Sequence, residues 1–233
     1  MRLASLFSGG KDSMMALYVM EQMGHEVPYL VNIIPKRGDS WVFHTPNLHL
    51  IPLMAEALGK ELVQVEGGVD ESEDLAALRD ALQGLDVEGV ITGALASDYQ
   101  WDRINRVCDL IGLKVMSPLW RKDQDMVVTE MVDAGISSMI VAVMAEGLDE
   151  GWLGVKIDSD NLTSLREKSQ RHGISVAGEG GEYETLTLDS PAHSQVLIVD
   201  EYESDVHRDS AFMRVTKAHL GERKPLINSI SPL

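Results

Sequence analysis

Apolar and polar positions along the first 145 residues follow two spacings in turn. Short, mostly apolar runs at residues 3–7, 29–34, 62–65, 89–92 and 138–143 are typical of strands buried on both faces of a sheet. Between them, apolar residues recur at helical spacing, for example over residues 50–58, 75–82 and 124–134. This alternation predicts an α/β fold, a doubly wound, mostly parallel sheet with helices on both faces.

The pattern changes after residue 145, where glycines become frequent. Short apolar segments at residues 185–188, 195–199 and 212–215 predict the strands of a smaller, β-rich C-terminal part. We therefore expect a larger domain at residues 1–145, a smaller α+β subdomain at residues 146–220 and a loosely held tail at residues 221–233.

Composition and charge limit the classes of protein that fit. With 44% hydrophobic and 24% charged residues, the chain has the composition of an ordinary globular protein. The net charge of −17 counts against a stable complex with nucleic acid, because proteins that bind RNA or DNA normally carry a basic face. No apolar run reaches the roughly 18–20 residues of a membrane span and no signal peptide is recognisable, so we expect a cytoplasmic protein without membrane contact.

Cys108 is the only cysteine in the chain. An intrachain disulfide is therefore excluded, and persulfide relay, iron–sulfur and zinc-finger chemistry lack the Cys-x-x-Cys pair that they need. The apolar neighbours Val107 and Ile111 predict that Cys108 is a buried structural thiol.

The strongest chemical signal is the segment Ser8-Gly9-Gly10-Lys11-Asp12-Ser13, which connects the first predicted strand to the first predicted helix. Its glycines let backbone N–H groups approach a phosphate, and the start of the helix adds partial positive charge. Lys11 adds a full positive charge, whereas Asp12 is out of place in a simple anion site, which suggests that it either holds Mg²⁺ or orients the loop. The spacing is not that of a Walker A motif, which needs Gly-x-x-x-x-Gly-Lys-Ser/Thr.

This hexapeptide resembles the PP-loop of the N-type ATP pyrophosphatases, which cleave ATP between the α- and β-phosphates to adenylate a substrate. The resemblance implies a fold of the adenine nucleotide α-hydrolase type, with residues 1–145 as the PP-loop nucleotide-binding domain and residues 146–220 on the substrate side. It also implies that residues 8–13 hold the departing pyrophosphate of ATP together with Mg²⁺.

Two further loops are expected to meet this one, because ligands of such sheets bind beyond the carboxyl ends of the strands. They begin at Asn32 and at Gly93. Asp98 stands where a helix follows the second loop, so it is either a site carboxylate or a plain N-cap. Arg103 lies one turn later and either neutralises the α-phosphate or pairs with a surface carboxylate.

Four other segments narrow the resemblance to the diphthine–ammonia ligase family. They are Phe43-His44-Thr45-Pro46-Asn47, Gly93-Ala94-Leu95-Ala96-Ser97-Asp98-Tyr99-Gln100, Pro118-Leu119-Trp120 and Gly178-Glu179-Gly180-Gly181-Glu182-Tyr183-Glu184-Thr185. The family uses ATP and ammonia to amidate diphthine, a modified histidine of translation elongation factor 2, and releases diphthamide, AMP and pyrophosphate. The resemblance thus implies an AMP-forming carboxylate–ammonia ligase with elongation factor 2 as its protein substrate, and a homodimer is compatible with the sequence.

The acidic segment around residue 180 suits this chemistry. Diphthine carries a quaternary ammonium group, which Glu179, Glu182 and Glu184 with Tyr183 can attract by charge and by cation–π contact. One of these carboxylates can instead bind ammonium or take a proton from it. An acidic loop that is merely solvated is the alternative without a function.

The resemblance and the motifs together give three sets of expected site residues. The expected catalytic residues are Lys11, Asp12, Asp98, Arg103 and Glu182, with Asp12 as the metal ligand. The expected nucleotide site comprises Ser8, Gly9, Gly10, Lys11, Asp12, Ser13, Asn32, Gly93 and Ser97. The expected substrate site comprises His44, Tyr99, Gln100, Glu179, Gly180, Gly181, Tyr183 and Glu184.

Two other functions stay open at the level of the sequence. One is a PP-loop enzyme that modifies RNA by thiolation or lysidine formation, against which the single cysteine and the charge of −17 count. The other is an ATP sensor without turnover, against which Lys11 and Asp12 count.

Overall fold

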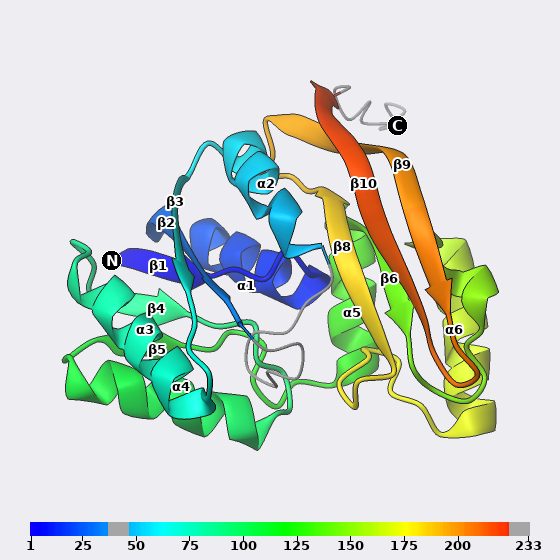
Figure 1. The fold of residues 1–233 in the computed structure, drawn as a ribbon, viewed down its shortest axis with the longest axis horizontal. Helices are drawn as coiled ribbons and strands as arrows, with labels where there is room; N and C mark the ends of the chain where they lie inside the picture. The colour runs from blue at the N-terminus through cyan, green and yellow to red at the C-terminus, as the bar shows by residue number, and fades with distance from the viewer. Residues whose placement is uncertain (37–46, 224–233) are drawn as a thin grey trace, which may run out of the picture.

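The computed structural model describes residues 1–36 and 47–223, and these form two sheets with helices packed around them (Figure 1). The first sheet contains β1 (Arg2–Leu6), β2 (Glu26–Ile34), β3 (Glu61–Glu66), β4 (Gly89–Ile91) and β5 (Lys114–Met116). Its strand order is β3-β2-β1-β4-β5, and every neighbouring pair is parallel. The predicted doubly wound parallel sheet is therefore confirmed.

Helices cover both faces of this sheet because its strands are apolar on both sides. In β1, Leu3 packs in the core shared with α1 (Lys11–Gln22) and α2 (Ile51–Leu58), which follows a short 3-10 turn at Leu48–Leu50. The next residue, Ala4, packs in the opposite core with α3 (Glu71–Gln83) and α4 (Asp98–Leu110). Cys108 is fully buried in this second core, as predicted, and burial raises the pKa of its thiol to about 12.

The second sheet is antiparallel and is built on β6 (Ser137–Val143). β6 pairs with β7 (Lys156–Ile157), β8 (Tyr183–Asp189) and β10 (Ala211–Glu222), and β9 (Gln195–Val206) pairs with β10 at the edge. The predicted β-rich C-terminal part is thus confirmed. The expectation that residues 138–143 continue the parallel sheet is wrong, because β6 takes all its partners from the later strands.

The helices of the second half are α5 (Gln124–Asp133) and α6 (Ser159–His172), with a 3-10 turn at Glu150–Trp152. Helix α6 was not predicted from the sequence. The helix buries only Leu162 and Leu165, so its apolar pattern is too sparse to detect. Its start is fixed instead by Asp158, whose carboxylate accepts hydrogen bonds from the amides of Asp160 and Asn161. None of the helices in the described ranges combines the length and apolar content of a membrane span.

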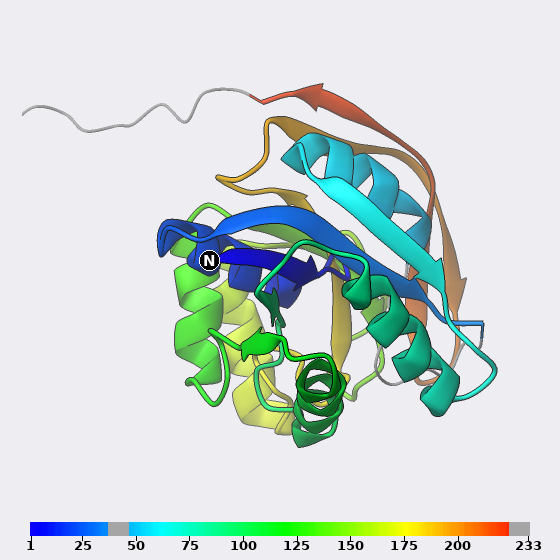
Figure 2. The same ribbon diagram turned by 90° about the vertical axis from the view of Figure 1, so that its left-hand side faces the viewer.

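The two sheets meet at the loop that follows β1. α2 lies between the first sheet and the β9–β10 hairpin (Figure 2), and α1 contacts β8. The Thr187 amide of β8 donates a hydrogen bond to the Gly9 carbonyl at 2.8 Å. Because β1 and β4 are neighbours at the point where the strand order reverses, the loops after both strands open into the same crevice.

Candidate functional site

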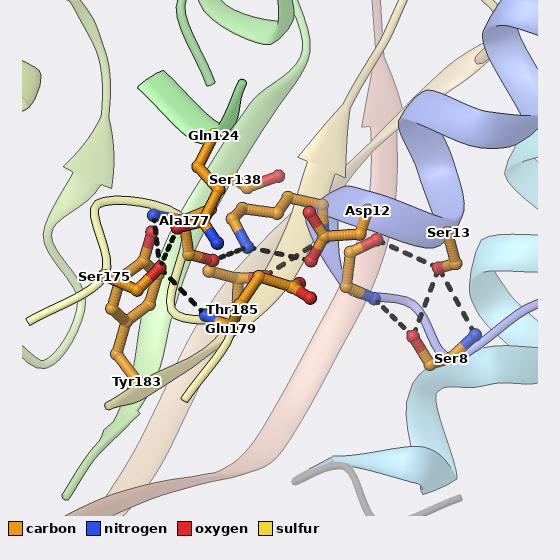
Figure 3. Close-up of polar contacts among 12 residues, drawn as sticks. Ser8, Asp12, Ser13, Gln124, Ser138, Ser175, Ala177, Glu179, Tyr183 and Thr185 are labelled. Carbon is orange, nitrogen blue, oxygen red and sulfur yellow. Dashed lines mark hydrogen bonds and ion pairs between the residues drawn. The ribbon is translucent and has the colours of Figure 1, made fainter. Parts of the chain in front are cut away.

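Residues 8–13 turn tightly from β1 into α1, and two serine hydroxyls hold this PP-loop in shape (Figure 3). The Ser8 hydroxyl accepts a hydrogen bond from the Gly10 amide at 3.3 Å and lies 3.2 Å from the Ser13 hydroxyl. The Ser13 hydroxyl donates to the Gly10 carbonyl at 3.0 Å. Residues 11–13 of this loop already form the start of α1, and a helix N-terminus favours a phosphate.

Two glycines are required here by space or by backbone conformation. Gly9 has a φ of +81°, and a Cβ on it would lie 2.9 Å from the Ile51 side chain. A Cβ on Gly93, in the loop after β4, would lie 2.7 Å from the Ser13 amide nitrogen and 2.8 Å from the Asp12 carbonyl carbon. The loop after β4 therefore rests directly on the PP-loop.

Lys11 joins the PP-loop to the C-terminal half. Its buried ammonium donates to the Asp12 carboxylate at 2.8 Å and to the Ala177 carbonyl at 2.5 Å. It lies 5.2 Å from the centroid of the Tyr183 ring. Burial by itself would lower the pKa of Lys11, but the charge of Asp12, with smaller contributions from Tyr183 and Glu179, raises it on balance. The side chain therefore stays a full positive charge inside the cavity.

Asp12 fits the role of a single carboxylate ligand for Mg²⁺. One of its oxygens accepts the hydrogen bond from Lys11, whereas Oδ1 is buried and has no hydrogen-bond partner among the described residues. Within residues 1–36 and 47–223 no group of three or more His, Cys, Asp or Glu side chains is arranged to hold a metal ion. This donor set suits Mg²⁺, which proteins commonly bind through one or two carboxylates together with substrate phosphates.

The acidic segment after α6 is folded by its own side chains. The Glu182 carboxylate accepts hydrogen bonds from the Ser175 amide at 2.7 Å and from the Gly180 amide at 2.8 Å. The Ser175 hydroxyl accepts from the amides of Ala177 and Glu179 and donates to the Gln124 side chain at 2.6 Å. Glu182 therefore shapes this loop and, unlike its two acidic neighbours, does not line the cavity.

Tyr183 is buried and is engaged at both ends of its side chain. Its hydroxyl donates to the Val176 carbonyl at 2.7 Å, and the Lys11 ammonium lies near its ring. Burial raises the pKa of this phenol, so the group stays neutral. Its partners inside the chain leave little of the ring for a quaternary ammonium, although the residue borders the cavity.

Glu179 and Glu184 are the two carboxylates of the segment that line the cavity. The Glu179 carboxylate accepts a hydrogen bond from the Ala96 amide at 3.0 Å, which ties the acidic loop to the loop after β4. Burial, reinforced by the negative charge of Asp12, raises the pKa of Glu179 to about 7. Burial also raises the pKa of Glu184 to about 7, although the Lys11 ammonium opposes this shift.

Of the site residues predicted at the start of α4, some line the cavity and others do not. Ser97 is the N-cap, because its hydroxyl accepts from the Gln100 amide at 3.3 Å, so the N-cap alternative for Asp98 is wrong. Asp98 is exposed and pairs with Arg121 at 2.6 Å. Arg103 pairs with Glu71 and stacks on the Tyr99 ring, its guanidinium carbon 3.3 Å from the ring centroid. Neither Asp98 nor Arg103 lines the cavity, whereas Ser97, Tyr99 and Gln100 do.

One cavity of about 950 Å³ connects these groups. Of the predicted residues, it is lined by Ser8, Gly10, Lys11, Asp12, Ser13, Asn32, Gly93, Ser97, Tyr99, Gln100, Glu179, Gly180, Gly181, Tyr183 and Glu184. Gly9 belongs to the PP-loop but does not line the cavity, since the space beside its Cα is filled by Ile51 and Met54, and His44 lies outside the described residues. The Asn32 amide is used within the chain, since it donates to the Phe7 carbonyl and accepts from Gln64.

Thr185 is a cavity residue that was not predicted from the sequence. Its hydroxyl accepts a hydrogen bond from the Lys11 amide at 3.0 Å, and it lines the cavity beside the PP-loop. The residue is the last of the acidic motif, and its position in that motif was the available signal. The contact of Lys11 with the Ala177 carbonyl could not be predicted in this way, because every residue has a backbone carbonyl.

Known protein families and relatives match nearly the whole length of this chain. The diphthamide synthase N-terminal domain matches residues 1–115, and the diphthamide synthase C-terminal domain matches residues 123–220. The diphthine–ammonia ligase of Danio rerio is 34% identical over 250 residues, which cover 96% of this chain and 98% of that protein. The diphthine–ammonia ligase of Homo sapiens is 36% identical over 253 residues, which cover 96% of this chain and 94% of that protein. A solved structure described as a predicted subunit of tRNA methyltransferase from Methanocaldococcus jannaschii matches 82% of this chain at 15% identity, with a TM-score of 0.43.

Proposed function

The chain belongs to the diphthine–ammonia ligase family, and on that basis we propose that it is a ligase that uses ATP to join ammonia to the carboxylate of diphthine. The protein substrate would be translation elongation factor 2, and the products would be diphthamide, AMP and pyrophosphate. A cytoplasmic location, where translation factors act, belongs to the same proposal. The homodimer stays a prediction.

One observation carries this proposal. The PP-loop and the acidic segment lie more than 160 residues apart in sequence, yet the Lys11 ammonium bonds to the Ala177 carbonyl and both segments line the same cavity. A phosphate-binding end and an acidic end within about 950 Å³ suit a reaction between a nucleotide, a cationic substrate and ammonia.

In this proposal, the residues at the phosphate-binding end act on ATP. Lys11 and the start of α1 would stabilise the negative charge that grows on the departing pyrophosphate. Asp12 would hold Mg²⁺, which supplies further charge neutralisation to the triphosphate when it is bound. Adenylation turns the carboxylate of the substrate into an electrophile with a good leaving group. Asp98 and Arg103 receive no step in this scheme, because their side chains pair with Arg121 and Glu71.

The two alternative functions are not favoured. The relatives that match nearly full length carry the name diphthine–ammonia ligase, not that of an RNA-modifying enzyme or of a sensor. Three arginines of the site region, Arg103, Arg106 and Arg121, each pair with a carboxylate, which lowers the positive charge that this region offers to RNA.

The direct test measures AMP and pyrophosphate from Mg·ATP with and without diphthine-bearing elongation factor 2 and ammonium. We expect release that depends on both additions, together with the mass decrease that accompanies conversion of a carboxylic acid to an amide. Release of ADP, or pyrophosphate release that requires RNA, would contradict the proposal.

A further inference from the structure

Glu184 differs from every other carboxylate of the acidic segment in its contacts. It is partly buried on β8 and lines the cavity, and none of the described residues forms a hydrogen bond or an ion pair with its side chain. Glu179 is bound to the Ala96 amide, and Glu182 is bound to the amides of Ser175 and Gly180. Glu184 is therefore the one carboxylate of this segment that is left to bind a ligand.

Its position places this carboxylate close to the PP-loop. Glu184 immediately precedes Thr185, whose hydroxyl holds the Lys11 amide at the start of α1. It lies close enough to Lys11, Asp12 and Glu179 for their charges to act on it. A cation at Glu184 would thus stand next to the PP-loop, where an adenylated carboxylate is formed in the proposed function.

We propose that Glu184 binds the ammonium ion and accepts its proton, so that ammonia attacks the adenylated substrate beside the PP-loop. The inference rests on the proposed function and deepens it. In this step the Glu184 carboxylate takes one proton from ammonium, and the lone pair of the resulting ammonia forms a C–N bond with the acyl carbon. The C–O bond to AMP then breaks with its electron pair on the phosphate, and the new nitrogen loses a second proton to solvent to give the amide.

The chemistry of the two cations that must enter the site supports this choice. Ammonium donates hydrogen bonds, so it needs an acceptor that is free, and Glu184 supplies one. A quaternary ammonium donates none and is held by aromatic faces and diffuse negative charge. The raised pKa of Glu184, about 7, favours a group that exchanges protons at neutral pH over a permanent counter-ion.

The test compares Glu184→Gln with Glu179→Gln in the full-length protein, using elongation factor 2 that carries diphthine. Adenylation is followed by exchange of labelled pyrophosphate into ATP, and the second half-reaction is followed by amide formation over a range of ammonium chloride concentrations. We expect Glu184→Gln to retain the exchange within a few-fold and to lower amide formation by roughly 100-fold. Hydroxylamine, which arrives as a neutral nucleophile, should restore much of the acyl transfer in this variant.

Glu179→Gln removes a charge from the same cavity, and we expect it to change both half-reactions to a similar degree. Glu184→Asp keeps the carboxylate and should retain part of the amide formation, which guards against a folding defect of the Gln variant. Unchanged ammonium dependence in Glu184→Gln, or loss of its exchange reaction, would overturn the role of Glu184 while leaving the ligase function intact. Absence of exchange in the unmodified protein would overturn the proposed function itself.

Discussion

At the scale of single residues, the site is built on charges that are buried yet balanced. Lys11 keeps its positive charge because Asp12 lies 2.8 Å away, although burial alone would favour the neutral amine. Glu179 and Glu184 show the opposite balance, since burial outweighs the nearby ammonium and raises the pKa of each to about 7. Such shifts cluster at functional sites because the charged groups are held there for a ligand and not for the stability of the fold.

Replacement of Lys11 by methionine tests the phosphate end. The variant keeps roughly the length of the side chain but removes the ammonium that contacts both Asp12 and the Ala177 carbonyl. We expect pyrophosphate release to fall by roughly 100-fold or more, the size typical of losing one electrostatic contact in a transition state. The exposed Lys156 provides the control, and Lys156→Met should leave the rate unchanged. Full turnover in Lys11→Met would show that residues 8–13 do not act as a PP-loop.

A second residue-scale prediction concerns His193, which is buried outside the cavity. Burial, with the positive charge of Arg223, lowers the pKa of His193 to about 4, while its Nδ1 shares a 2.7 Å hydrogen bond with the Ser190 hydroxyl. Between pH 6.5 and 4 the unfolded chain therefore takes up a proton that the folded chain refuses, so stability falls as the pH falls. We expect this residue to account for about 2 kcal/mol of unfolding free energy lost between pH 7 and 5.

Denaturant titrations of the wild-type chain and of His193→Gln at both pH values measure this contribution. The variant should show a correspondingly weaker loss of stability on acidification. His207 is exposed, so His207→Gln serves as the matched control and should follow the wild-type curve. Identical pH dependence in all three proteins would contradict a neutral, buried His193.

At the scale of elements, the site depends on loops that press against one another. The loop after β4 touches the PP-loop at Gly93, and Gly93→Ala would bring a methyl group to within 2.7 Å of the Ser13 amide nitrogen. Backbone cannot yield as a flexible side chain does, so we expect a loss of about 1–3 kcal/mol in stability and a marked loss of pyrophosphate release. Gly84→Ala is the control, since the nearest atom to its Cβ would be 3.9 Å away. Equal thermal stability and activity of the two variants would refute this packing argument.

Elements with a strong local signal could be predicted from the sequence. The apolar spacing of α2 and Gly59 after it fix that helix, and Gly59 adopts the left-handed conformation expected of a C-cap. α6 could not be predicted, because Leu162 and Leu165 are its only buried residues. The apolar run of β6 predicted a strand but not its sheet, since a run buried on both faces looks the same wherever its partners come from.

Within the site, too, residues in a contiguous motif could be predicted from the sequence, whereas roles that depend on tertiary contacts could not. Residues 8–13 carry their chemistry in a short contiguous motif, and the structure brings them to one cavity with the acidic segment. The division of labour among Glu179, Glu182 and Glu184 was not predictable, because the choice depends on which backbone amides the loop presents to each carboxylate. Asp98 and Arg103 were predicted from the motif and from the helix that follows it, yet neither side chain lines the cavity, because Asp98 pairs with Arg121 and Arg103 pairs with Glu71.

At the scale of the whole molecule, the two sheets share one core. Met14 and Leu17 of α1 belong to the same buried cluster as Ile140 of β6 and Leu186 of β8. Hydrogen bonds cross the junction as well, from the Lys11 amide to the Thr185 hydroxyl and from the Thr187 amide to the Gly9 carbonyl. The proposed boundary near residue 145 would thus separate two regions of different topology that do not fold independently of each other.

This arrangement predicts that residues 1–122 do not fold stably alone. The fragment keeps the parallel sheet but exposes the face of α1 that is buried against the second sheet in the full chain. Each fully buried aliphatic side chain that becomes exposed costs about 1.5–3 kcal/mol, so exposing several of them removes a free energy comparable to the whole stability of a typical domain, about 5–15 kcal/mol. We expect the full chain to melt in a single cooperative transition and the fragment to melt broadly and at lower temperature, as measured by circular dichroism. A sharp transition of the fragment near that of the full chain would mean that the PP-loop half is an autonomous domain, and that Lys11 reaches Ala177 across an interface and not through a common core.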